Sequence, residues 1–169
     1  VTPMRKEVDR CRMAIECALS GKTTAMISSG DAGVYGMAGL IYELAEGKNL
    51  EIEVIPGVTA ALSGGAVLGA PLTHDFAVIS LSDALTPWEK IETRLSHAAQ
   101  ADLCIAIYNA SSHRRPDYLK RACEILLRYI SPETVCGIVR NIGREGEDYK
   151  VMRLNELKGT QVDMFTTVF

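Results

Sequence analysis

A glycine-rich segment near the start of the chain carries residues that could bind a ligand. It reads Ser28-Ser29-Gly30-Asp31-Ala32-Gly33-Val34-Tyr35-Gly36 and lies between an expected strand and an expected helix. In open α/β sheets, ligands bind at such carboxyl ends of strands. The glycine spacing, G-x-x-G-x-x-G, differs from the dinucleotide fingerprint and from a P-loop, and the Asp31 carboxylate would repel a phosphate. The segment therefore predicts either a site for a neutral or cationic ligand, or a tight turn in which Asp31 caps the following helix.

A second segment has the same placement between a strand and a helix. It reads Pro56-Gly57-Val58-Thr59-Ala60-Ala61. The Thr59 hydroxyl can accept a hydrogen bond from the first turn of that helix, and the small residues after it would let a ligand approach the backbone closely. Taken alone, this segment predicts a helix cap more strongly than a binding site.

The elements that must position these segments alternate between helix and strand. We expect helices at residues 2–19, 37–46, 59–69, 88–99 and 116–130, and strands at residues 23–28, 51–55, 76–81, 102–108, 134–140, 149–154 and 162–169. This order predicts an α/β fold of two lobes, residues 1–74 and 75–169, with a mostly parallel sheet in the first lobe and a mixed sheet in the second. Because the chain opens on a helix and stops within an apolar strand, we expect the fold to be truncated at both ends.

Composition and charge argue against several classes of protein. Hydrophobic residues make up 47% of the 169 residues and charged residues 23%, which are ordinary values for a globular protein. The 18 basic and 21 acidic residues leave a net charge of −3, which is unfavourable for nucleic-acid binding. No apolar run approaches the roughly 18 residues that span a bilayer, and residues 1–7 lack the pattern of a signal peptide. The five cysteines form no C-x-x-C pair, and they predict reduced thiols in a cytoplasmic protein without a metal site.

Together, the two glycine-containing segments resemble the tetrapyrrole (uroporphyrinogen and corrin) methyltransferase family. Further pieces look like the precorrin-3B C17-methyltransferase branch and extend over essentially the whole chain. At position 32 the family's usual Pro is replaced by Ala32, and the family's opening strand is not found before Val1. The further pieces are Met4-Arg5-Lys6-Glu7, Tyr35-Gly36-Met37-Ala38-Gly39, Ala70-Pro71-Leu72-Thr73-His74-Asp75-Phe76, Ile79-Ser80-Leu81-Ser82-Asp83, Thr86-Pro87-Trp88, Tyr108-Asn109 and Val139-Arg140-Asn141-Ile142-Gly143-Arg144.

The resemblance implies a bilobal α/β enzyme that binds S-adenosyl-L-methionine between its lobes and releases S-adenosyl-L-homocysteine. It also implies a homodimer in cobalamin biosynthesis that methylates precorrin-3B or cobalt-precorrin-3B at C17 with ring contraction. A positively charged sulfonium cofactor agrees with Asp31, where a pyrophosphate would not. The residues that the resemblance places near the cofactor are Gly30, Asp31, Val34, Tyr35, Thr59, Ala60, Tyr108, Asn109, Thr166 and Thr167.

Ring contraction should benefit from a proton donor or acceptor, although methyl transfer from a sulfonium needs no nucleophile on the protein. His74 and Asp83 are the candidate catalytic residues, because both are expected in loops that lead toward the cleft. The alternatives are a structural hinge for His74 and a cap of the turn before Trp88 for Asp83.

Four arginines could pair with the carboxylates of a corrin precursor, or they could be solvated surface charges. They are Arg114, Arg115, Arg140 and Arg144. Two other functions fit the same sequence: methylation at another position of a precorrin, and cofactor binding by a homologue without catalysis.

Overall fold

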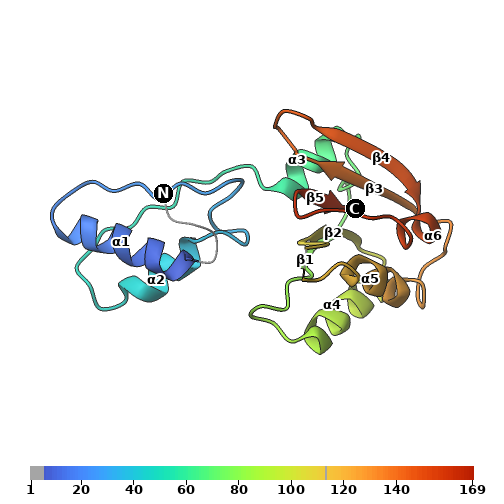
Figure 1. Ribbon diagram of the computed structural model, residues 1–169, viewed down its shortest axis with the longest axis horizontal. Helices are drawn as coiled ribbons and strands as arrows, with labels where there is room; N and C mark the ends of the chain where they lie inside the picture. The colour runs from blue at the N-terminus through green and yellow to red at the C-terminus, as the bar shows by residue number, and fades with distance from the viewer. Residues whose placement is uncertain (1–5, 113) are drawn as a thin grey trace. The chain divides into compact units, whose positions relative to one another are not determined.

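The computed structural model describes residues 6–112 and 114–169, and the chain divides into two compact units, Val1–Thr59 and Ala60–Phe169 (Figure 1). Helix α3 (Ala60–Val67) belongs to the second unit because it packs on strand β5 (Thr166–Val168). This division by contacts falls earlier than the predicted lobe boundary after His74. The lobe boundary itself stays a prediction.

Among the described residues of the first unit, two helices form the regular structure. Helix α1 (Glu7–Leu19) packs against α2 (Ala38–Ala45) and buries Cys11 and Ile15, which lie four residues apart on one face. Gly21 ends the first helix in a left-handed conformation with φ of 85°. Both helices were predicted, although the expected start at Thr2 and Pro3 lies outside the described residues.

The expected strands at residues 23–28 and 51–55 are not formed. No strand ladder occurs among the described residues of the first unit, so the mostly parallel sheet predicted there is absent from them. The reason is the lack of a partner: the side chain of Ile27 is 86% exposed and that of Ile55 is 69% exposed. An apolar run becomes a strand only when a neighbouring strand satisfies its backbone and another layer covers its side chains.

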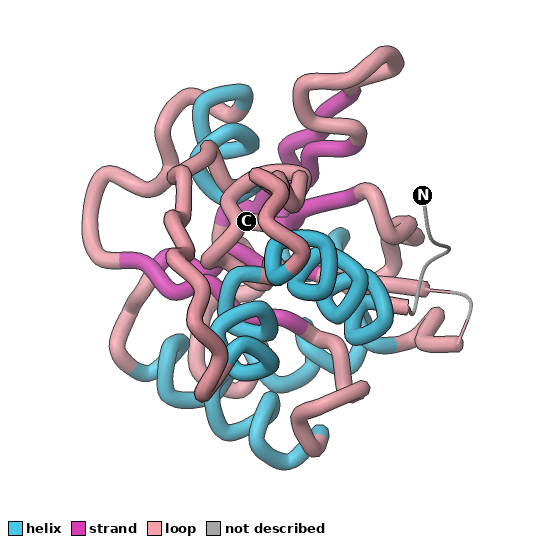
Figure 2. Tube along the Cα trace, turned by 90° about the vertical axis from the view of Figure 1, so that its left-hand side faces the viewer, coloured by secondary structure: helices cyan, strands magenta, loops and turns pink. Residues whose placement is uncertain are grey.

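The second unit contains one mixed sheet of five strands in the order β1-β2-β5-β3-β4, and all the magenta strands of Figure 2 belong to it. Strands β1 (Phe76–Ser80) and β2 (Cys104–Tyr108) are parallel, with Ser80 opposite Tyr108. Strands β3 (Val135–Arg140) and β4 (Asp148–Arg153) form an antiparallel pair, and β5 lies antiparallel to both β2 and β3. The predicted α/β class and the mixed sheet of the second half are thus confirmed.

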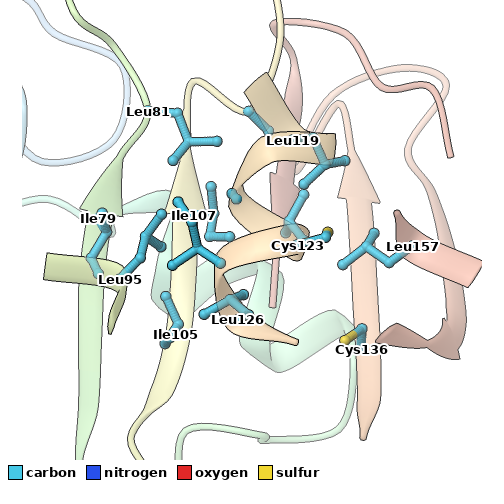
Figure 3. Packing of buried hydrophobic residues seen from close by; sticks show 14 of the residues in the cluster. Ile79, Leu81, Leu95, Ile105, Ile107, Leu119, Cys123, Leu126, Cys136 and Leu157 are labelled. Carbon is cyan, nitrogen blue, oxygen red and sulfur yellow. The ribbon is translucent and has the colours of Figure 1, made fainter. Parts of the chain in front are cut away.

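Helices α4 (Trp88–Gln100), α5 (Tyr118–Leu126) and the short α6 (Leu154–Leu157) enclose the core of this unit. In Figure 3, Leu119, Cys123 and Leu126 of α5 lie in the same cluster as Ile107 of β2 and Cys136 of β3. The spacing of these α5 residues places them on one face of the helix. The segment 154–157 was not predicted as a helix; its start is held by the Arg153 N–H, which donates to the Glu156 carboxylate at 2.7 Å.

Helix α3 covers the other face of β3. Cys136 points into the core beside α5, so its neighbour Gly137 faces the opposite side. There Leu68 fills the space that a Cβ on Gly137 would occupy. Because Leu68 directly follows α3, the end of this helix is thereby fixed against the sheet. None of the helices in the described part of the chain is long and apolar enough to cross a membrane.

Candidate functional site

The segment from Gly30 to Gly36 is a compact loop closed on itself. The Ala38 N–H at the start of α2 donates to the Ala32 carbonyl at 3.0 Å. A Cβ on Gly36 would overlap that same carbonyl oxygen, so only glycine fits this approach. Gly30 and Tyr35 both have left-handed backbone conformations, with φ of 76° and 54°. The glycine spacing therefore serves a tight turn, as one of the two interpretations predicted.

The carboxylate of Asp31 joins this loop to the second glycine-containing segment. Oδ1 accepts a hydrogen bond from the Gly33 N–H at 2.7 Å, and Oδ2 accepts one from the Gly57 N–H at 2.9 Å. These bonds, the Gly57 bond foremost, hold the pKa of Asp31 below its ordinary value, so the side chain is ionised at neutral pH. Asp31 does not cap α2, whose N-cap position is Met37 and carries no side-chain cap.

The second segment leads directly into α3. Thr59 is the last residue of the first unit, and Ala60 is the first residue of the helix. The Ala61 N–H donates to the hydroxyl of Tyr108 at 2.6 Å, which ties the first turn of α3 to the carboxyl end of β2. The interpretation of Thr59 as the helix cap stays a prediction.

The carboxyl ends of β1 and β2 form a second cluster of polar groups. Asn109 follows β2 in a left-handed conformation with φ of 54°, which asparagine tolerates better than most residues. Its Nδ2 donates to the Ser80 Oγ at 2.9 Å, and that oxygen also accepts from the Ser82 N–H at 3.1 Å. The parallel pairing thus places Tyr108 and Asn109 beside the first residues after β1.

Thr166 and Thr167 lie at the same edge of the sheet. Strand β5 runs antiparallel to β2 with Val168 opposite Ile107, so the residues before Val168 lie beside those after Ile107. Both threonines are buried. The Thr166 hydroxyl donates to the Asp163 carboxylate at 2.8 Å, and Arg140 donates to the other oxygen of that carboxylate at 2.7 Å. Asp163 was not predicted from the sequence, because its partner Arg140 lies 23 residues away in β3.

Asp83 is part of a cluster with side chains at the start of α5. Its Oδ2 accepts a hydrogen bond from the Tyr118 hydroxyl at 2.6 Å, and Arg115 lies 3.5 Å from its Oδ1. The Tyr118 hydrogen bond is the main cause that lowers the pKa of Asp83, and the same bond raises the pKa of Tyr118. The Tyr118 ring packs on Trp88 with 4.7 Å between centroids, and the Arg121 guanidinium lies 3.9 Å above the Trp88 ring.

Tyr118 was missed by the sequence analysis. The available signal was the three-residue spacing of Arg115, Tyr118 and Arg121, of which Tyr118 and Arg121 share one side of α5 and Arg115 precedes that helix. That pattern marks a face able to receive a carboxylate. It does not identify Asp83, which lies 35 residues away in sequence, as the partner.

His74 and Asp83 are not brought together. His74 is exposed and precedes β1, whereas Asp83 follows β1 beyond Ser80. The five residues of that strand separate the two ends by about 13 Å, at 3.3 Å per residue. Of the four arginines, Arg115 pairs with Asp83 and Arg140 with Asp163, while Arg114 is exposed.

The two glycine-containing segments suit a positively charged small ligand better than a phosphate. Residues 28–36 and 56–62 contain no Lys or Arg, and their one ionised group is Asp31. Gly33 and Gly57 are exposed, so a ligand can reach the peptide groups there. Among the residues that the structure describes, no group of three His, Cys, Asp or Glu side chains could hold a metal ion.

Comparison with known proteins decides the family. Residues 3–158 match the family described as Tetrapyrrole (Corrin/Porphyrin) Methylases. The chain belongs to this family. The resemblance stated from the two glycine-containing segments is thereby confirmed.

Relatives within the tetrapyrrole methylases are similar to nearly the whole chain. A cobalt-factor III methyltransferase of Priestia megaterium is 48% identical over 99% of the chain, but the match spans only 32% of that protein. A probable cobalt-factor III C(17)-methyltransferase of Salmonella typhimurium is 46% identical over 99% of the chain and 70% of its own length. The crystal structure of the methyltransferase CobJ has a TM-score of 0.91 at 38% identity, covering 99% of this chain and 72% of that one. The chain therefore spans about a third to seven tenths of these proteins.

Proposed function

We propose that the chain carries out S-adenosyl-L-methionine-dependent C-methylation of a corrin precursor in cobalamin biosynthesis. The proposed substrate is precorrin-3B or cobalt-precorrin-3B, methylated at C17 with contraction of the macrocycle. The observation that carries the proposal is the sequence identity of 46% to 48% with proteins named cobalt-factor III methyltransferases. The likeness in fold to CobJ supports it.

The chemistry of the glycine-containing segments supports the cofactor. When bound, S-adenosyl-L-methionine supplies an electrophilic methyl group on a cationic sulfur, and S-adenosyl-L-homocysteine is the product. Segments that lack basic residues and contain one ionised carboxylate fit that charge. The residues proposed to form the cofactor site, by direct contact or by positioning its backbone, are Gly30, Asp31, Val34, Tyr35, Thr59 and Ala60, together with Tyr108, Asn109, Thr166 and Thr167 of the sheet edge.

The work of this chain in methyl transfer is chiefly to hold the reactants in line. Alignment of reacting atoms is worth effective molarities of roughly 10⁵–10⁸ M in favourable cases. Compact loops and a sheet edge are suitable supports, since their backbones are fixed by the Asp31, Tyr108 and Asn109 hydrogen bonds. The chain's peptide groups orient the ligand, and no side chain needs to form a covalent bond.

Asp83 and His74 are the proposed catalytic residues for ring contraction. In its ionised form Asp83 would act as a weak proton acceptor, because the hydrogen bond that Tyr118 donates to it lowers its pKa, and Tyr118 would retain its own proton. His74 would serve at the other end of β1, at a different part of a large macrocycle. Loss of such help slows a reaction by about 10²–10⁴-fold.

We further propose that the chain works as a homodimer in the cytoplasm. The edge strand β4 supports the first part, because Tyr149 and Val151 on it, with Val135 of the neighbouring β3, leave apolar side chains exposed. A second copy could cover them. Size-exclusion chromatography with light scattering tests the dimer, and a monomer at micromolar concentration would contradict it.

The experiment that tests the function is incubation with methyl-labelled S-adenosyl-L-methionine and either precorrin-3B or its cobalt form, followed by NMR of the product. A label at C17 of a contracted ring supports the proposal. A label at another carbon supports methylation of a different precorrin position. Binding of S-adenosyl-L-homocysteine without turnover on any precorrin supports a non-catalytic homologue, and equal affinity for ATP would overturn the cofactor assignment.

A further inference from the structure

Both carboxylate oxygens of Asp31 are engaged by peptide groups of two segments that lie 26 residues apart in sequence. We propose that Asp31 is a positioning residue and that it does not bind the positive charge of the cofactor. Its hydrogen bonds with the Gly33 and Gly57 N–H groups, called the clip below, hold the two glycine-containing segments together. The inference rests on the proposed function, because the backbone that the clip positions is the backbone proposed to bind S-adenosyl-L-methionine.

The stereochemistry of Gly57 supports the clip. A Cβ at this position would overlap the Gly30 carbonyl oxygen and lie 3.4 Å from the Asp31 Cα. The φ angle of Gly57 is outside the left-handed region, so conformational freedom is not what requires glycine here. The requirement is the close approach of one segment to the other, and the Gly57 N–H bond to Asp31 forms at that contact.

The charge of Asp31 is used inside the protein. Hydrogen bonds from peptide N–H groups to an ionised carboxylate are shorter and stronger than bonds to a neutral acceptor. Asparagine at position 31 would keep one acceptor oxygen, but it would turn an N–H₂ group toward either the Gly33 or the Gly57 N–H, and one bond would be lost. A side chain that acts in this way influences the cofactor through the position of the loops.

Three ligands of different charge distinguish the positioning role of Asp31 from direct contact between its carboxylate and the cofactor. S-adenosyl-L-methionine has a sulfonium and an ammonium group, S-adenosyl-L-homocysteine keeps only the ammonium, and 5′-methylthioadenosine has neither charge. Calorimetry with wild type and Asp31→Asn should show affinity reduced by the same factor, about 10- to 100-fold, for all three ligands. Gly57→Ala should give the same uniform loss with the carboxylate intact.

Gly39→Ala is the matched control, because a Cβ at Gly39 in α2 would meet no atom within 4 Å. It should bind all three ligands as wild type does. A loss in Asp31→Asn confined to S-adenosyl-L-methionine would mean that Asp31 faces the sulfonium. A loss for both charged ligands but not for 5′-methylthioadenosine would mean that it faces the ammonium. Either result, or unchanged affinities in both variants, overturns the inference.

Amide NMR spectra without ligand give a readout that does not depend on the proposed function. The Gly33 and Gly57 amide protons should resonate downfield in wild type, and both should move upfield in Asp31→Asn, with the Gly39 signal unchanged. If wild type binds none of the three ligands, the proposed function fails and these two signals alone decide the clip. Should Asp31→Asn not fold, Gly57→Ala decides it, since unchanged binding by that variant contradicts the clip.

Discussion

In its described residues, the second unit of the chain builds its backbone on a five-stranded sheet, whereas the first unit combines two helices with long extended segments. The second unit covers its sheet with helices and buries a large apolar cluster. The described part of the first unit buries Cys11, Ile15 and Ala45, and it leaves Ile27 and Ile55 exposed. Apolar burial therefore determines the structure of the second unit. Individual hydrogen bonds such as those of Asp31 determine the loop geometry of the first unit.

The largest expected effect comes from removing a core side chain of the second unit. Leu95→Ala should lower the free energy of unfolding by about 2–5 kcal/mol, because Leu95 in α4 is fully buried. Ile27→Ala, in an extended segment of the first unit, should change it by less than about 0.5 kcal/mol. Urea unfolding followed by circular dichroism measures the free energy of unfolding of both variants. Equal decreases would contradict the contrast between a unit held by apolar burial and one held by individual hydrogen bonds.

A smaller effect is expected where α3 meets β3. Gly137→Ala should cost about 1 kcal/mol, because the new methyl group would displace the end of Leu68, a flexible side chain. Gly36→Ala in the first unit should instead disturb its own loop, since its methyl group would overlap the Ala32 carbonyl. In Gly36→Ala, amide NMR shifts should change only at residues near Ala32. Changes over a wider part of the first unit would show that the loop is coupled to an apolar core.

The smallest effect is expected at the surface of the second unit. Tyr118→Phe removes the hydrogen bond that lowers the pKa of Asp83, so that pKa should rise toward its ordinary value, as measured by carboxyl ¹³C NMR. A lowered pKa in the folded state stabilises the protein above the ordinary carboxyl pKa, and this stabilisation is lost as the pH falls through the folded value. The variant should therefore lose less stability on acidification than wild type, by under about 1 kcal/mol because Asp83 is partly exposed. Tyr149→Phe, on the exposed side of β4, is the control and should leave the Asp83 titration unchanged.

The sequence predicted the strands and the longer helices of the second unit, but not α6, because their patterns and their partners agree. Residues 76–81 and 102–108 are apolar runs, and in the structure β1 and β2 pair with each other and are covered by α4. Residues 23–28 have a similar composition, yet they form no strand. Composition within a segment cannot reveal whether a partner strand exists, and for that reason the strands expected at residues 23–28 and 51–55 are not found in the structure.

The candidate site was predictable to the extent that it depends on local turns. Glycine spacing and the resemblance identified the two segments that contain Asp31, Gly33 and Gly57, and the structure links these three residues by hydrogen bonds. The partners of Asp83 were not predictable, because Tyr118 and Arg115 reach it across the fold. Local sequence likewise gave no indication that His74 and Asp83 lie at opposite ends of one strand.

The position of β5 in the sheet has a consequence for biosynthesis. This strand is the last of the five in sequence order, yet it lies between β2 and β3, with Gly137 and Phe169 exchanging two backbone hydrogen bonds. During translation, β1 with β2 and β3 with β4 can each pair as soon as they are made. The two pairs can join only after β5 has left the ribosome. Until then, both inner edges are open to pairing with another chain, so the nascent protein is most prone to aggregation just before synthesis of this strand is complete.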